Sequence, residues 1–230
     1  VSIVDHALVP SGMGINGRMT DQNNRTVRRK GRSVFLLTVL FRPRAVFDDL
    51  AIAEPSPFRV FFKFLIWFAL LPPLFAYIGG KRYGWDLGAA TPLQLEDRAL
   101  IIVSSLYFLA LLAALVSTAF ISRWMSVTYG ARHSLGVHMA MVAILAAPIA
   151  VGSIIHLYPH VFINLLVLIP ALIWAMYLLY AGLPVALGIS PERGFLMASS
   201  LVAWLLVAFV SLLGITVGLW ANGLGPSIGA

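Results

Sequence analysis

The sequence contains no cysteine and few charged residues. Charged side chains make up 11% of its 230 residues and hydrophobic ones 60%, whereas about a quarter of a soluble domain is charged. So much apolar surface cannot be buried inside a water-soluble globule, so the composition predicts a membrane protein. The lack of cysteine excludes disulfides and thiolate chemistry and leaves the redox compartment open.

Charges are also missing from the interior of the long apolar segments. Five segments come close to the ~20 residues that a membrane helix requires, at residues 60–78, 99–121, 137–155, 161–183 and 195–219. Apart from tyrosines, only Lys63 in the first segment and His138 near the edge of the third are ionisable. Because intramembrane charges mark ion and proton pathways, their absence argues against a proton-coupled pump. The pattern predicts an all-α, polytopic membrane protein with five transmembrane helices.

No constellation of catalytic residues stands out in the sequence. There is no nucleophile beside a base, no phosphate-binding loop and no carboxylate pair placed for acid–base chemistry. We therefore expect no enzymatic activity, no catalytic residues and no cofactor.

The first 32 residues are polar and basic, and they carry much of the net charge of +7. Because this block lies next to a membrane helix, we expect a cytoplasmic segment attracted to anionic lipid, and no binding of nucleic acid. No apolar run typical of a signal peptide lies within it. The residues expected to contact lipid headgroups or a protein partner are Arg28, Arg29, Lys30, Arg42 and Arg44.

Residues 33–58 predict short amphipathic helices at the membrane interface. The apolar run at 33–41 has nine residues and is too short to span a bilayer. In residues 45–53, Val46, Phe47 and Leu50 fall on one helical face, with Asp48 and Asp49 turned toward water. We expect this segment to lie along the membrane surface.

The distribution of basic residues predicts the orientation. If the N-terminus is cytoplasmic, thirteen of the sixteen Lys and Arg residues lie on the inner side, Lys63 included, and three lie outside. The positive-inside rule then favours a cytoplasmic N-terminus and an outer C-terminus, which ends in a short tail at residues 221–230.

The stretch from Trp174 to Gly194 predicts a corner between the fourth and fifth spans. Tyr177 and Tyr180 follow Trp174 at three-residue spacing, which is typical of a membrane interface. We expect Gly182 and Pro184 to end the helix, with Gly182 in a backbone conformation that side chains resist. Pro191 should begin the next helix. The tyrosine hydroxyls should bond water, lipid or the facing loop.

Three further features leave alternatives open. Gly214 and Gly218 form a small-xxx-small pair suited to close helix packing. His156 and His160 have a spacing used by metal sites, but Pro159 lies between them, so we expect an outer polar loop and no metal. Prolines inside the spans fit either the broken helices of transporters or a static kinked bundle; these are Pro72, Pro73, Pro148 and Pro170.

The string YLLYAGLPVALGISPERGF resembles the bacterial form of the Yip1 family of integral membrane proteins. Upstream, RPRAVFDDLAIAEPSP and an apolar helix with Leu71-Pro72-Pro73 that ends at Gly79-Gly80 also resemble that family's entry segment. The likeness covers roughly residues 40 to 220, so the Yip1-like domain is assigned to residues 59–220. The Asp-Leu-Gly-Pro-Leu type motif of the eukaryotic Golgi members is absent, so their GTPase and trafficking roles are not carried over.

The resemblance implies a non-enzymatic membrane-organising or adaptor protein of the bacterial inner membrane. It would act through helix contacts and its cytoplasmic N-terminal segment, with anionic lipids and other membrane proteins or a second copy as partners. The alternative is a transporter or channel for a small uncharged or lipid-like solute. A polar cavity walled by Ser104, Asn164 or Ser199 would favour the alternative, whereas a solidly packed bundle would favour the adaptor.

Overall fold

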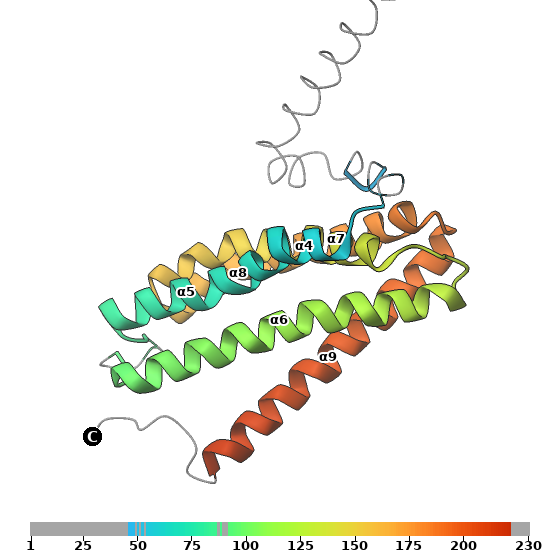
Figure 1. The fold of residues 1–230 in the computed structure, drawn as a ribbon. Helices are drawn as coiled ribbons and strands as arrows, with labels where there is room; N and C mark the ends of the chain where they lie inside the picture. Colours follow the sequence, from blue (N-terminus) through green and yellow to red (C-terminus); the bar gives the residue numbers. More distant parts are fainter. Residues whose placement is uncertain are drawn as a thin grey trace, which may run out of the picture.

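In the computed structural model, the chain folds into five long helices that run alternately in opposite directions (Figure 1). The structure describes residues 46–48, 50, 52, 54–86, 88 and 92–221. The helices long and apolar enough to cross a membrane cover Pro57–Tyr83, Asp97–Thr128, Leu135–Leu157, Val161–Leu187 and Pro191–Ile215. The predicted all-α architecture with five spans is confirmed.

The first span is a continuous helix made of three parts. These are α4 (Pro57–Val60), a π-helical turn (Phe61–Leu65) and α5 (Ile66–Tyr83). The predicted end at Gly79-Gly80 is wrong, because α5 continues to Tyr83 and ends at Gly84, which has φ 71°. Gly79 has a packing role instead. A Cβ there would collide with the backbone carbonyl oxygen of His156, so the glycine lets two backbones approach closely.

The other helices also extend beyond the predicted spans. They are α6 (Asp97–Thr128), α7 (Leu135–Gly152) with a 3₁₀ turn after it (Ser153–Leu157), α8 (Val161–Leu187) and α9 (Pro191–Ala221). Hydropathy marks only the part of a helix that fits the hydrocarbon core, about 30 Å thick. Backbone hydrogen bonds continue into polar residues, so α6 extends seven residues past the predicted end at Ile121.

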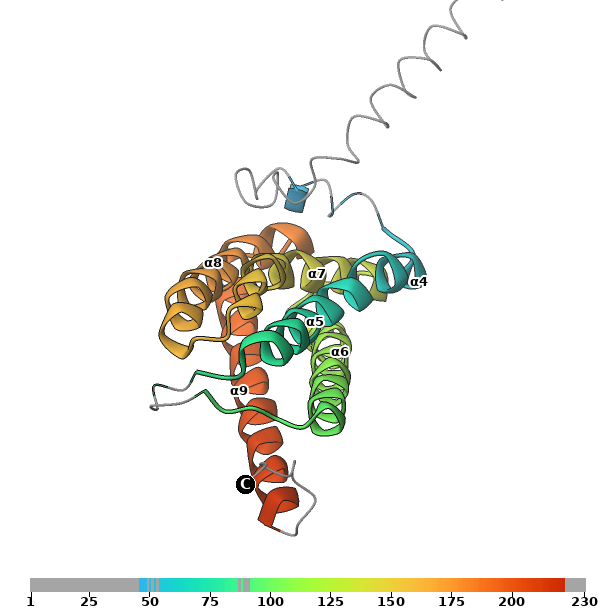
Figure 2. The same cartoon turned by 90° about the vertical axis from the view of Figure 1, so that its left-hand side faces the viewer.

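Helix α7 forms the centre of the bundle. Figure 2 shows it between α8 and α5, with α6 below. It is apolar on all sides, as a helix surrounded by neighbours must be. Its buried residues include Val137, His138, Met139, Met141, Val142, Ala143, Ile144, Ala147, Pro148 and Ala150. The core of the described chain is therefore built around α7.

The predicted amphipathic segment before the first span is partly described. Residues 46–48, 50 and 52 are helical. Phe47 and Leu50 are buried in the core, Val46 is half-buried and Asp48 is exposed, so the predicted apolar face is confirmed for these residues. This face packs against the bundle. Residues 1–45, with Arg28, Arg29, Lys30, Arg42 and Arg44, lie outside the described residues, as does the tail at 222–230.

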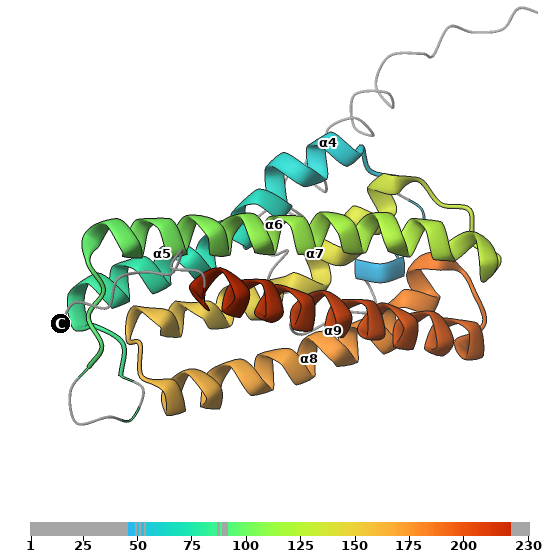
Figure 3. The same cartoon turned by 90° about the horizontal axis from the view of Figure 1, so that it is seen from below.

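Helix α9 begins within the bundle and then leaves it. Its first turns bury Met197, Ala198 and Leu201. Beyond Leu201 its described side chains are mostly exposed, and Figures 1 and 2 show its second half standing away from the other helices. Seen from below in Figure 3, the helix lies between α6 and α8.

Candidate functional site

The predicted corner lies later in the chain than the sequence indicates. Helix α8 continues through Gly182 and Pro184 to Leu187, so the prediction that these two residues end the helix is wrong. The helix ends at Gly188, which is left-handed with φ 59°. The Ile189 N–H then donates to the Pro184 carbonyl over 3.1 Å. Pro191 begins α9 as predicted, because its fixed φ suits a first helical turn.

Gly182 is required for space and not for an unusual backbone. It lies within α8 and its φ is not positive. A Cβ at this position would collide with the aromatic ring of Phe47. The missing side chain of Gly182 therefore leaves the space in which Phe47, from the segment before the first span, packs onto α8.

The two tyrosines of the predicted corner have different roles. The Tyr180 hydroxyl lies 3.2 Å from the Ser199 hydroxyl of α9, a helix partner that the sequence did not predict. Its ring packs 5.2 Å from the Phe195 ring. Tyr177 is exposed and its ring lies 5.1 Å from the ring of Trp174. Tyr180 therefore joins α8 to the first half of α9.

A Cβ on Gly214 or Gly218 would not touch another helix in the described part of the chain. Both lie in the projecting half of α9, where a Cβ would meet no atom within 4 Å. Their predicted role in close helix packing stays a prediction.

His156 and His160 are separated by the turn that contains Pro159. The His156 Nδ1 atom is hydrogen-bonded to the Asn164 side-chain oxygen, whereas the His160 Nε2 atom lies 3.6 Å from Asp86 Oδ2. Asn164 also donates to the Tyr158 and His160 carbonyls. Among the described residues, no group of three or more His, Asp or Glu side chains is placed to hold a metal ion. These residues hold the turn between α7 and α8.

A serine and a histidine form a buried pair between α6 and α7. Ser122 Oγ lies 2.9 Å from His138 Nδ1, and both side chains are fully buried. The pairing resembles a nucleophile and its base. However, the His138 Nε2 atom has no hydrogen-bond partner among the described residues. Among the described residues no carboxylate is bonded to the ring, and the pair links α6 to α7.

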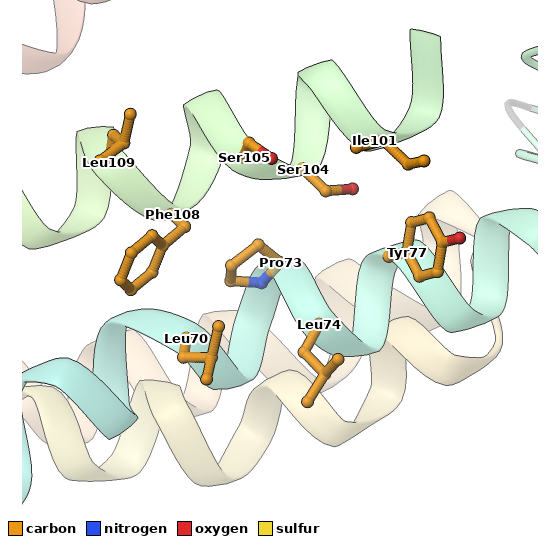
Figure 4. A pocket seen from close by; sticks show the side chains of 9 residues that line it. All are labelled: Leu70, Pro73, Leu74, Tyr77, Ile101, Ser104, Ser105, Phe108 and Leu109. Carbon is orange, nitrogen blue, oxygen red and sulfur yellow. The ribbon is translucent and has the colours of Figure 1, made fainter. Parts of the chain in front are cut away.

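A groove of about 430 Å³ lies between α5 and α6 (Figure 4). Pro73 and Phe108 face each other across it, and Ser104 and Ser105 are its only hydroxyl groups besides Tyr77. Leu74, Ile101 and Leu109 at its edges are exposed, so it opens toward the membrane. The remaining lining residue is Leu70. Such a surface can accept a hydrocarbon chain or an apolar side chain.

The three residues named as possible walls of a polar cavity are not brought together in the described part of the chain. Ser104 lines the groove, Asn164 holds the 158–160 turn and Ser199 bonds Tyr180. The three residues thus lie in three separate environments.

Comparison with known proteins identifies the family. The model of the Yip1 domain matches residues 37–212. This chain belongs to the Yip1 domain family. It is 33% identical over 155 residues to inner membrane protein YohC of Escherichia coli strain K12, which is 67% of this chain and 80% of the relative. YohC of Escherichia coli O6:H1 matches to the same extent. No solved structure matches.

Several residues of this Yip1 domain were not found by sequence reasoning. The Ser122–His138 pair and the facing of Pro73 and Phe108 depend on which helices are neighbours, and no local pattern signals them. Gly188 had a signal, because a glycine two to three residues before a proline is typical of a helix end. The Gly182-Leu183-Pro184 motif, which comes earlier in the chain, led to a predicted helix end that is too early.

Proposed function

We propose that this Yip1 domain protein is a non-enzymatic adaptor that acts through contacts between helices in the plane of the membrane. The docking surface is the second half of α9. The observation that carries the proposal is that this half of the helix stands apart from its own bundle and that a Cβ on Gly214 would meet no described atom within 4 Å. In lipid, small residues on an exposed helix face let a second helix approach closely.

Two contacts connect the start of the described chain to the base of this surface. Phe47 packs against Gly182 of α8, and Tyr180, two residues earlier, bonds Ser199 of α9. A partner bound to the N-terminal segment would thereby act on the α8–α9 corner. This coupling supports an adaptor that uses both its N-terminal segment and its last helix.

Photo-crosslinking in native membranes tests the proposal. A benzophenone amino acid at Leu213 or Val217 of α9 should give a discrete protein–protein adduct. Ile173 of α8 is exposed to a similar degree and is the control position, which should label lipid only. Replacing Gly214 and Gly218 by Leu should abolish the adduct without lowering expression. Lipid adducts alone at Leu213 and Val217 would reject the proposal.

We also infer that the N-terminus is cytoplasmic and the C-terminus lies outside, from the thirteen-to-three distribution of Lys and Arg. Single cysteines can be introduced freely because the chain has none. A membrane-impermeant maleimide should label a cysteine that replaces Gly88 or Gly225 in intact cells. A cysteine that replaces Arg132 should be labelled only after permeabilisation. Labelling of Arg132 in intact cells would overturn the orientation.

The groove between α5 and α6 favours a second candidate, the handling of a lipid-like solute. Its apolar lining and its opening toward the membrane suit an acyl chain. The rate of lipid exchange between vesicles should then fall when Ser104→Phe fills the groove. Ala113→Phe, on an exposed part of α6, is the control. Equal rates in the wild type, both variants and empty vesicles would reject this candidate.

A further inference from the structure

A second pocket lies at the opposite end of α6, where the chain turns toward α7. It has a volume of about 700 Å³. It combines apolar and basic side chains, and its lining residues are Phe120, Arg123, Trp124, Ser126, Val127, Thr128, Arg132 and His133. None of them is acidic. The pocket is separate from the α5–α6 groove and from the projecting half of α9.

The basic groups of this pocket are available to an anion. Arg123 and Arg132 are exposed, and neither forms an ion pair within the described part of the chain. His133 Nε2 donates to the Leu187 carbonyl over 3.2 Å, which fixes the imidazole beside the end of α8. An Arg193 guanidinium nitrogen lies 3.0 Å from the position of a Cβ on Gly130, so a third arginine reaches the same loop. This end of the bundle therefore concentrates positive charge.

The length of α6 places the pocket at the depth of lipid headgroups. Between Arg98 and Arg123, residues 99–122 carry no Asp, Glu, Lys or Arg. At 1.5 Å per residue they extend about 36 Å, which exceeds the ~30 Å hydrocarbon core. When Arg98 is at one surface, Arg123 must reach the other.

The apolar side of the pocket faces the membrane. Trp124 is 76% exposed, and Phe120 and Val127 are exposed beside it on α6. An exposed indole near a helix end is typical of the membrane interface. A ligand of this pocket thus meets positive charge at one end and hydrocarbon at the other. A free anion could contact only the charged end.

We propose that this pocket binds one anionic phospholipid. Arg123 and Arg132 contact the phosphate, and the acyl chains lie along Phe120, Trp124 and Val127. The site does not depend on the adaptor function, because it uses none of the residues assigned to it. It also differs from the basic N-terminal residues expected to contact lipid, since its geometry is built by α6 and the following loop.

Lipid titration of the full chain in neutral detergent tests the site. Native mass spectrometry should show one phosphatidylglycerol retained, with at least about tenfold preference over phosphatidylcholine. Arg123→Gln with Arg132→Gln should lower the phosphatidylglycerol affinity about tenfold or more, because each basic side chain near an anionic lipid surface contributes about 1 kcal/mol. Arg82→Gln with Arg98→Gln removes the same charge at the other end of the bundle and should leave the affinity unchanged.

Two further measurements distinguish the source of the phosphate and avoid dependence on one variant. Inorganic phosphate at equal concentration should neither compete with phosphatidylglycerol nor protect the protein thermally; protection equal to that of the lipid would overturn the lipid assignment. Phosphatidylglycerol with brominated chains should quench the tryptophan fluorescence of the wild type more than that of Trp124→Phe. Brominated phosphatidylcholine, at the same low fraction of the total lipid, should quench the two proteins equally. Equal quenching by phosphatidylglycerol in both proteins, or equal loss of affinity in the two double arginine variants, would overturn the proposal.

Discussion

Helices α7 and α9 have similar apolar compositions but opposite surroundings. Most side chains of α7 are buried against neighbouring helices, whereas α9 beyond Leu201 is mostly exposed. In a bilayer both environments satisfy an apolar side chain, because lipid is as apolar as leucine. The difference is one of packing density: α7 loses contacts when its side chains are truncated, and α9 has few to lose. We infer that α7 maintains the fold and that α9 is free for external contacts.

Truncation of one isoleucine in each helix should give the largest contrast. Ile144 of α7 is 2% exposed and Ile215 of α9 is 59% exposed. Ile144→Ala should lower the free energy of unfolding by about 3 kcal/mol through the cavity it leaves, whereas Ile215→Ala should change it by less than about 0.5 kcal/mol. Denaturation in one mixed detergent would measure both. Equal losses would show that α9 is packed as tightly as α7.

Glycine replacement should separate the two regions by a smaller margin. Gly182→Val would force the side chain against the Phe47 ring and should cost about 2 kcal/mol by overpacking. Gly214→Val has open space and should cost little. Thermal unfolding of the purified variants measures both. Phe47→Ala should relieve part of the cost of Gly182→Val; a strictly additive double variant would argue against the contact.

The polar contact between α6 and α7 should contribute less. Ser122→Ala removes the partner of His138 Nδ1 and leaves that nitrogen buried without a hydrogen bond, at a cost of about 1.5 kcal/mol. Ser117→Ala is the matched control on α6, because that hydroxyl bonds the carbonyl of Ala114 in its own helix. Chemical denaturation should rank Ser122→Ala below Ser117→Ala in stability. The opposite ranking would remove any structural role for the Ser122–His138 pair.

The smallest effect is expected where α9 joins the bundle. Tyr180→Phe removes the hydroxyl that bonds Ser199 and should cost about 1 kcal/mol. Tyr177→Phe is exposed and should be nearly neutral. Melting temperatures in the same detergent would compare them. If Tyr177→Phe were the more damaging variant, the assignment of Tyr180 as the link between α8 and α9 would be wrong.

Local patterns in the chain were sufficient for the fold class and for the positions of the spans. Runs of apolar residues near the length of a bilayer predicted all five helices, and Pro191 correctly predicted the start of α9. The apolar face formed by Phe47 and Leu50 was also predictable, because its helical spacing lies within a few residues. Each of these features depends on neighbours in sequence, and the sequence alone determined them.

Only the tertiary structure decided what individual residues within the helices do. Gly182 looks like a helix breaker in sequence, but it lies inside α8 because the Phe47 ring fills the space of its missing side chain. Gly214 looks like a packing residue, but a Cβ there would meet no atom of the described chain within 4 Å. Arg123 and Arg132 lie on either side of a turn, and their shared pocket exists only because α6 continues seven residues past Ile121. Such roles depend on which surfaces meet, and an apolar pattern is the same whether a helix faces protein or lipid.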